Sequence, residues 1–307
     1  FILLLFFKMC YSFIVGVTNF HWFLTDKGEN MKHTEGTFKS MRDLKIYHQA
    51  WLPEGEVKAI LMIVHGVGEY SGRYTNVVNR FVPLGYAVYG LDHIGHGKSE
   101  GEREMVNRFE DFTEPLTTYY QKIIEQHPGI PVFIYGHSMG ALITSFYLLD
   151  HQEKFIGAII SAPPVVVPAN ITPFTITLGK ILSTIAPKMG LIGLDTNYLS
   201  HDKQVVETYN TDPMVFHGKM PARLSAEMLR AMTRVSDEAA RITLPLFILH
   251  GSGDQIVDLA GAKMLYEKAN STDKTLKIYE GLYHEVHNEL DRDLMFSDLE
   301  QWLSARI

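Results

Sequence analysis

The sequence of 307 residues predicts an α/β fold with a mostly parallel, doubly wound sheet and an inserted helical cap. Two observations predict this fold class. Short apolar runs typical of buried parallel strands alternate with segments of helix length. One long interval, residues 163–241, separates two such runs by far more than a crossover needs. We therefore expect a core of residues 31–162 and 242–307, with residues 163–241 as the cap, or lid.

The expected elements follow in chain order. A polar turn at residues 41–43, between apolar runs at 38–40 and 44–52, predicts an antiparallel hairpin. The buried strands are expected at residues 59–64, 86–91, 132–135, 157–161, 244–249 and 275–279. The helices between them are expected at residues 74–84, 109–126, 141–149 and 259–269.

Composition narrows the possible partners. The formal net charge is -7 and the pI is near 6.1, so no basic stripe is available for a phosphate backbone and we expect no nucleic acid partner. The single cysteine, Cys10, allows no internal disulfide and no cysteine metal cluster. This composition fits a reducing compartment, and we expect a cytoplasmic protein.

Residues 1–30 form a separate apolar segment. Residues 1–24 carry only Lys8 as a full charge, and the run is about as long as a membrane-spanning helix. Three interpretations compete: a membrane anchor, a cleaved signal, or translated upstream sequence with the natural start at Met9 or Met31. The predicted fold begins near Met31 in each case.

The stretch Gly-His-Ser-Met-Gly, residues 136–140, follows a predicted strand and precedes a predicted helix. Glycines two residues on either side of Ser138 allow the sharp turn that lifts a serine hydroxyl out of the fold. The turn also places Ser138 at a helix N-terminus, which favours negative charge. The pattern alone is common enough to arise by chance, so the other strand ends must support it.

Polar residues collect at the carboxyl ends of the other predicted strands, where open α/β sheets bind ligands. Asp254 ends the stretch His-Gly-Ser-Gly-Asp, and His284 ends Glu-Gly-Leu-Tyr-His. The order Ser138, Asp254, His284 is that of an α/β-hydrolase catalytic triad. His287 is the rival base, and Asp258 is the rival acid but is expected to cap a helix.

Acyl transfer also needs N–H donors for the oxyanion. The residue after the nucleophile, Met139, supplies one in this fold, and the loop after the first buried strand supplies the other. Val67 lies between two glycines in that loop, so it is the expected second donor.

Several longer motifs resemble the monoglyceride lipase family. They are the elbow at residues 136–140, HGVGEYSGRY at 65–74, DHIGHGKSEGER at 92–103, YNTDP at 209–213 and TLKIYEGLYHEVHNEL at 275–290. The resemblance implies hydrolysis of monoacylglycerols to fatty acid and glycerol, with Ser138 as nucleophile and no metal or organic cofactor. It further implies that four residues line a glycerol pocket: Glu69, Arg73, Tyr209 and His287.

The sequence departs from this family at three places. Tyr70 stands where a histidine is usual, Ala141 follows the elbow in place of a second glycine, and Val257 occupies the acid loop, where mammalian members carry a cysteine. The middle of the cap, residues 219–234, matches weakly. Acyl-chain preference therefore does not follow from the resemblance.

The cap is rich in apolar residues between positions 171 and 194. Phe174, Leu178, Ile181, Leu182 and Ile185 recur at helical spacing, and periodicity alone favours packing of this stripe on the core. Further apolar residues lie off the stripe: Ile176, Met189, Leu191 and Ile192. This excess predicts an acyl tunnel or contact with a membrane surface, and hence peripheral membrane association.

Other functions remain open at this point. A lysophospholipase or another carboxylesterase would use the same triad. A proline-type aminopeptidase would need cap carboxylates that face the substrate amine, for which Asp195, Asp202, Glu207 and Glu227 are the candidates. A non-catalytic binding protein is the remaining alternative, and the oligomeric state is left open.

Overall fold

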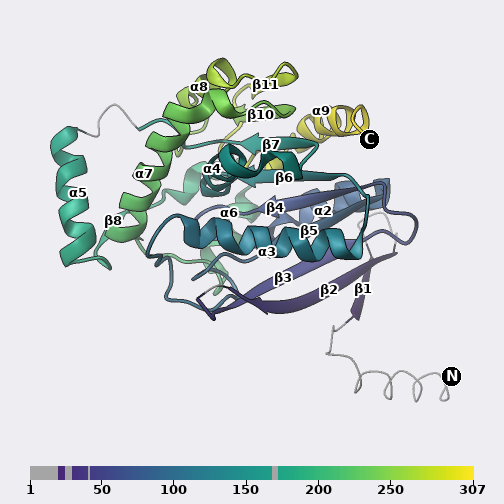
Figure 1. Cartoon of the computed structure of the whole chain (residues 1–307), viewed down its shortest axis with the longest axis horizontal. Coiled ribbons are helices and arrows are strands. Elements are labelled where there is room, and N and C mark those ends of the chain that lie inside the picture. Colours follow the sequence, from purple (N-terminus) through teal and green to yellow (C-terminus); the bar gives the residue numbers. More distant parts are fainter. Residues whose placement is uncertain (1–19, 25–29, 41, 168–171) are drawn as a thin grey trace, which may run out of the picture.

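The computed structural model describes residues 20–24, 30–40, 42–167 and 172–307 (Figure 1). Within these residues one nine-stranded sheet has the order β1-β2-β3-β5-β4-β6-β7-β10-β11. Its strands are β1 Phe20–Leu24, β2 Asn30–Lys39, β3 Lys45–Leu52, β4 Ala59–Val64, β5 Tyr86–Leu91, β6 Val132–His137, β7 Gly157–Ser161, β10 Leu246–Gly251 and β11 Lys274–Tyr279. The first three strands run antiparallel, and β3 joins β5 antiparallel; all later pairs are parallel. The predicted fold class is confirmed.

Helices cover both faces of the sheet, and the buried strands contribute side chains to the core on each face. In β4 the residues Ile60, Met62 and Val64 join one core cluster, and Leu61 and Ile63 join the other. The helices of the first cluster are α3 Glu110–Gln126, α4 Met139–His151, α7 Ala222–Glu238 and α8 Ala260–Lys268, and those of the second are α2 Thr75–Phe81 and α9 Arg292–Ser304. A strand buried on both faces has no polar side to show, which explains the unbroken apolar runs in the sequence.

The predicted elements agree closely with the observed ones. Strands β4, β5 and β7 have the expected bounds, and the expected hairpin is β2 paired with β3. Strand β10 begins at Leu246, two residues later than expected, because Pro245 has no N–H to donate to a ladder. The helix expected over residues 74–84 is α2 flanked by the short 3-10 turns η1 Ser71–Tyr74 and η2 Val82–Leu84, and Pro83 lies in the second turn.

Most of the N-terminal apolar segment, residues 1–19, lies outside the described residues. Residues Phe20–Leu24 form β1, which pairs antiparallel with β2, so the interpretation of residues 1–24 as one membrane-spanning helix does not hold for Phe20–Leu24. Among the helices of the described ranges, none combines the length and apolarity that crossing a membrane requires.

The chain between β7 and β10 builds a layer at one end of the sheet (Figure 1). Its elements are α5 Pro173–Ile185, β8 Gly190–Ile192, η4 Thr196–Tyr198, α6 Lys203–Thr211, β9 Met220–Pro221, α7 Ala222–Glu238 and η5 Ala239–Arg241. Helix α7 packs on α4 of the core, and α5 packs on α7 on the side away from the sheet. The division into core and cap at residues 163 and 241 stays a prediction.

Two hydrogen bonds join this layer to the loop after β4. The N–H of Phe216 donates to the carbonyl of Gly68 over 2.8 Å, and the hydroxyl of Tyr70 donates to Asp212 over 2.7 Å. The cap is therefore fastened next to the loop in which the second oxyanion donor is expected.

Candidate active site

Ser138 occupies a strained turn between β6 and α4. Its backbone has φ 54° and ψ -125°, a region that non-glycine residues rarely adopt. A Cβ atom on Gly136 would lie 2.4 Å from Thr144 Oγ1, and one on Gly140 would lie 2.0 Å from the carbonyl of Val64. The two glycines therefore allow strand, turn and helix to pack closely enough to hold the serine in this conformation.

His284 and Asp254 are brought together by the loops after β11 and β10. His284 Nδ1 lies 2.7 Å from Asp254 Oδ2. The other carboxylate oxygen of Asp254 accepts hydrogen bonds from the N–H groups of Ile256 and Val257 over 2.7 and 3.0 Å. Burial acts to raise the pKa of Asp254, but His284, His250 and the Val257 N–H hold it well below its usual range. Asp254 is therefore an ionised carboxylate fixed toward the imidazole.

The imidazole of His284 lies beside the elbow. Its ring centroid is 4.7 Å from that of His137, the residue before Ser138. Backbone N–H groups of His284 and Glu285 donate to the carbonyls of Tyr198 and Leu199 in the cap, over 3.2 and 2.8 Å. Burial lowers the pKa of His284, but Asp254 outweighs burial and leaves it raised. A raised pKa makes His284 a stronger base.

The rival base and acid have other surroundings. His287 stacks on Tyr74, with ring centroids 5.0 Å apart, and burial lowers its pKa to about 4. Asp258 lies one residue before the N-cap of α8, which is Leu259 and not Asp258 as expected, and it accepts a hydrogen bond from the N–H of Ala260. The geometry therefore favours His284 and Asp254.

The expected oxyanion donors both lie close to Ser138. Val67 lines the same cavity as Ser138, and a Cβ atom on the neighbouring Gly66 would lie 3.3 Å from the Ser138 Cβ. Met139 is the first residue of α4, a position at which the backbone N–H has no partner within the helix. An oxyanion donor is identified by its hydrogen bond to the substrate oxygen, so the roles of these two N–H groups stay predictions.

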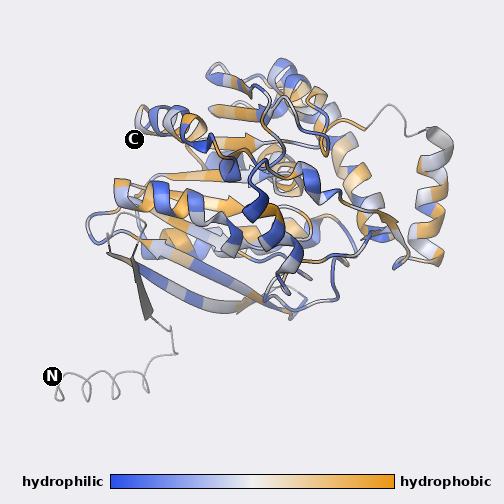
Figure 2. Ribbon diagram, turned by 180° about the vertical axis from the view of Figure 1, so that it is seen from behind, coloured by the Kyte–Doolittle hydropathy of each residue, from blue (hydrophilic) through white to orange (hydrophobic). Residues whose placement is uncertain are grey.

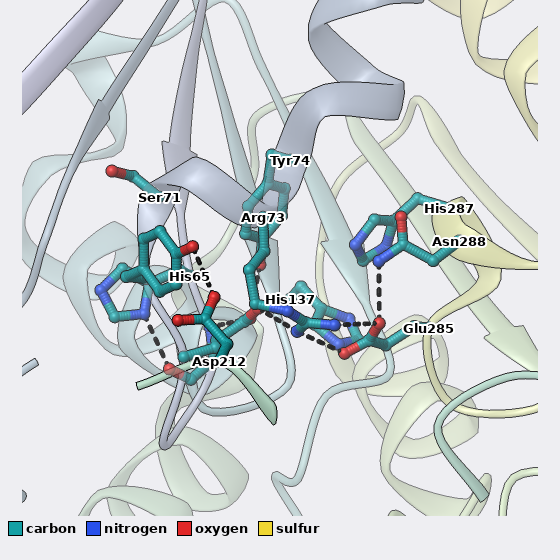
Figure 3. Close-up of polar contacts among 12 residues, drawn as sticks. His65, Ser71, Arg73, Tyr74, His137, Asp212, Glu285, His287 and Asn288 are labelled. Atoms are coloured by element: carbon teal, nitrogen blue, oxygen red, sulfur yellow. Dashed lines mark hydrogen bonds and ion pairs between the residues drawn. The ribbon is translucent and has the colours of Figure 1, made fainter. Parts of the chain in front are cut away.

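Arg73 is the centre of a buried polar network next to the loop after β11, which carries His284 (Figure 3). Its side chain is 8% exposed and donates to Glu69 over 2.7 Å and to both oxygens of Glu285 over 2.7 and 2.8 Å. Asn288 donates to Glu285 over 2.8 Å, and the Tyr209 ring lies 4.6 Å from the guanidinium carbon.

The network holds two carboxylates with one guanidinium. Burial acts to raise the pKa of Glu285, but Arg73 holds it below its usual range. Burial, together with the charge of Glu285, raises the pKa of Glu69 although Arg73 opposes the shift. Of the four residues expected to bind glycerol, Tyr209 lines the cavity, whereas Glu69, Arg73 and His287 are buried in and around this network.

A cavity of about 390 Å³ opens at Ser138 between the core and the cap. Much of its wall is apolar and comes from the cap, including Ile192, Leu194, Met220, Met228, Leu229 and Met232. Of the four cap carboxylates considered for an aminopeptidase, Asp195 lines this cavity, and it accepts a hydrogen bond from the N–H of Asn197. Glu227 pairs instead with Arg223 and Arg230. The wall suits an acyl chain better than a peptide amine.

Sequence reasoning missed three features of the site. His250 Nε2 lies 3.1 Å from Asp254 Oδ2, so the acid contacts two histidines. Glu285 holds Arg73, and Glu104 lines the cavity. Each of these residues lies in a motif rich in charge or glycine, and nothing in its spacing marks which side chain turns inward. In the described part of the chain, no cluster of three or more His, Cys, Asp or Glu side chains could hold a metal ion.

The strained serine at the strand-to-helix turn and the Asp254–His284 pair define a serine hydrolase of the α/β-hydrolase class. Comparison with known proteins agrees with this class. Residues 55–291 match the family described as serine aminopeptidase, S33. A monoacylglycerol lipase of Mycolicibacterium smegmatis is 33% identical, over 89% of this chain and 98% of that protein. The human monoglyceride lipase is 36% identical, over 85% of this chain and 87% of that protein.

A solved structure of similar sequence is that of the Paleococcus ferrophilus monoacylglycerol lipase. It is 28% identical, has a TM-score of 0.76, and is matched over 85% of this chain and 99% of that one. The chain therefore belongs to the serine hydrolase family that includes the monoglyceride lipases. The resemblance seen in the sequence motifs is confirmed.

Proposed function

We propose that the protein hydrolyses monoacylglycerols to a free fatty acid and glycerol. The observation that carries this proposal is the apolar cavity that opens directly at Ser138, within a chain whose curated relatives include monoacylglycerol lipases from bacteria and mammals. An apolar cavity accommodates an acyl chain, and the polar groups at its Ser138 end suit an ester and a polyol headgroup.

In the proposed mechanism Ser138 attacks the ester carbonyl while His284 accepts the hydroxyl proton. Asp254 keeps the imidazole in the tautomer that leaves Nε2 free to take that proton. Backbone N–H groups of Val67 and Met139 bind the oxyanion of the tetrahedral intermediate. His284 then protonates the departing glycerol, and the same histidine activates the water that releases the fatty acid from Ser138.

We further propose that α5 places the cap against a membrane surface. Leu178, Ile181 and Ile185 share one face of α5 and are exposed, with Ile181 at 51% and Ile185 at 73%. The expectation that this stripe packs on the core is therefore wrong for these three residues. Met189 and Ile192 continue the exposed apolar surface to β8, and Figure 2 shows apolar residues along this outer edge. Because Ile192 also lines the cavity, a bilayer-resident substrate would meet the cap close to the cavity.

The test of the hydrolase proposal compares three substrates and two proteins. The wild-type chain and Ser138→Ala are assayed with a monoacylglycerol, a lysophospholipid of the same acyl chain and an aminoacyl amide. We expect serine-dependent release of fatty acid chiefly from the monoacylglycerol, and a loss of several orders of magnitude in Ser138→Ala.

Other results of these assays would identify one of the alternative functions. Preference for the lysophospholipid would make the protein a lysophospholipase. Cleavage of the amide would make it an aminopeptidase, and unchanged turnover in Ser138→Ala would exclude the proposed nucleophile. A fluorophosphonate that fails to label the wild-type chain would support a non-catalytic binding protein.

A further inference from the structure

Glu104 is a buried carboxyl group that the mechanism does not use. It is 2% exposed, yet it lines the same cavity as Ser138. Its backbone has φ 54°, a left-handed conformation that a glutamate rarely adopts. The turn is fixed by close packing, because a Cβ atom on Gly95 would lie 2.3 Å from the carbonyl of Glu102. A strained residue whose side chain lines the cavity is a reason to look for a function.

The carboxyl group of Glu104 converges with the Tyr209 hydroxyl on the oxyanion loop. A Cβ atom on Gly68 would lie 3.1 Å from Tyr209 Oη and 3.3 Å from Glu104 Oε1. Two oxygen atoms from different elements therefore meet beside Gly68, next to Val67, in the wall of the cavity that Ser138 also lines.

No cation neutralises this carboxyl group within the described residues. The basic side chain that faces it is His96 of the same loop, with Nε2 3.9 Å away, and burial lowers the pKa of His96 to about 4. Tyr209 faces it from α6 and is itself buried, with its pKa raised. Other ionisable groups around the cavity, this loop and Tyr209 include Arg73, Arg103, Asp195, His217 and Asp258.

The charge state of Glu104 follows from this environment. Burial raises the pKa of Glu104 to about 8, although the Gly68 amide opposes the shift. At neutral pH the group is therefore mainly a carboxylic acid, which can donate a hydrogen bond as well as accept one. Ionisation above that pH would place a negative charge beside the developing oxyanion and oppose the reaction.

We propose that Glu104 is a specificity-determining residue that binds a hydroxyl of the glycerol headgroup and so selects esters of uncharged polyols. The proposal rests on the proposed monoacylglycerol hydrolysis and deepens it. Within this geometry Tyr209 Oη is the second polar contact for the headgroup, and the apolar cap wall receives the acyl chain.

The test uses the full-length chain with Glu104→Gln, Glu104→Met and the matched control Glu102→Gln. Glu102 lies in the same turn, but its side chain is exposed and pairs with Lys188. The substrates are a monoacylglycerol and the p-nitrophenyl ester of the same fatty acid, which has no hydroxyl for Glu104 to bind. We expect Glu104→Met to lower kcat/KM for the monoacylglycerol by roughly two- to tenfold relative to the p-nitrophenyl ester, the value of one net hydrogen bond.

The pH profile gives an independent measurement. For the wild-type chain we expect kcat/KM toward the monoacylglycerol to fall as pH rises past about 8, and for Glu104→Gln we expect this fall to disappear. Glu102→Gln should match the wild type in both measurements. Should Glu104→Met fail to fold, the Glu104→Gln profile decides the matter.

Two results would overturn the role of Glu104: an unchanged ratio between the two substrates in Glu104→Met, or the same alkaline fall in Glu104→Gln. A wild-type chain that cleaves the p-nitrophenyl ester but no monoacylglycerol would instead overturn the proposed function, and the headgroup role with it. The two failures are thus distinguishable.

Discussion

The core and the cap on either side of the cavity are held in different ways. On the core side the catalytic loop is fixed by buried charge: Arg73 joins Glu69 to Glu285, and His284 is paired with Asp254. On the cap side α5 exposes an apolar face and packs mainly on α7. The chemistry depends on the exact positions of a few atoms, whereas uptake of an apolar substrate needs only apolar area.

On the core side, the largest loss of activity is expected from Asp254→Asn. We expect kcat to fall by roughly 10⁴-fold, because an amide favours the wrong imidazole tautomer. The acid limb of kcat/KM should also move to lower pH, since Asp254 raises the pKa of His284 and the neutral imidazole is the active form. The measurement is a pH–rate profile with a p-nitrophenyl ester. A profile with an unshifted acid limb would contradict the assignment of Asp254.

The next largest effect is expected from Arg73→Met, which leaves Glu69 and Glu285 buried without their cation. Removing one partner of a buried ion pair destabilises a protein by about 3–5 kcal/mol. The matched control is Arg80→Met, because the pair of Arg80 with Glu300 is partly exposed and should contribute about 0–1 kcal/mol. Urea unfolding measures both, and equal losses would show that the buried network contributes no more than a surface pair.

A smaller effect should follow on the cap side from the double substitution Ile181→Glu and Ile185→Glu. Two isoleucines that insert partly into a bilayer contribute about 1.5–3 kcal/mol together, so vesicle binding should weaken by roughly ten- to a hundredfold. Turnover of a water-soluble p-nitrophenyl ester should be unchanged, because neither residue lines the cavity. The control is Leu294→Glu on α9, where the leucine is 62% exposed. If this control lost as much vesicle binding as the α5 variant, α5 would not be the site of membrane contact.

The last prediction returns to the core side and concerns the effect of Glu104 on stability. The pKa of Glu104 is raised above 4.5 in the folded chain, so the stability that its neutral form provides is complete below pH 4.5 and is lost as pH rises toward about 8. Glu104→Gln does not ionise, so its Tm relative to the wild type should rise across this window by several degrees. A Tm difference that stayed flat from pH 5 to pH 9 would contradict a buried carboxylic acid. Glu102→Gln should show no such trend.

The sequence by itself determined the sheet and the order of the catalytic candidates. A strand buried on both faces must be apolar throughout, so the unbroken apolar runs in the sequence were enough to predict β4, β5 and β7. Likewise, close packing of strand, turn and helix requires glycine at positions 136 and 140, so the elbow around Ser138 has a local signature.

Only the tertiary structure decided which polar residues turn inward. Glu104 and Glu102 lie two residues apart in one charged turn, yet the first lines the cavity and the second is exposed. Arg73 and Glu285 are 212 positions apart in sequence and meet only because the loops after β4 and β11 pack together. The exposure of α5 was decided in the same way, by packing on α7. Such contacts depend on long-range packing, for which local spacing carries no signal.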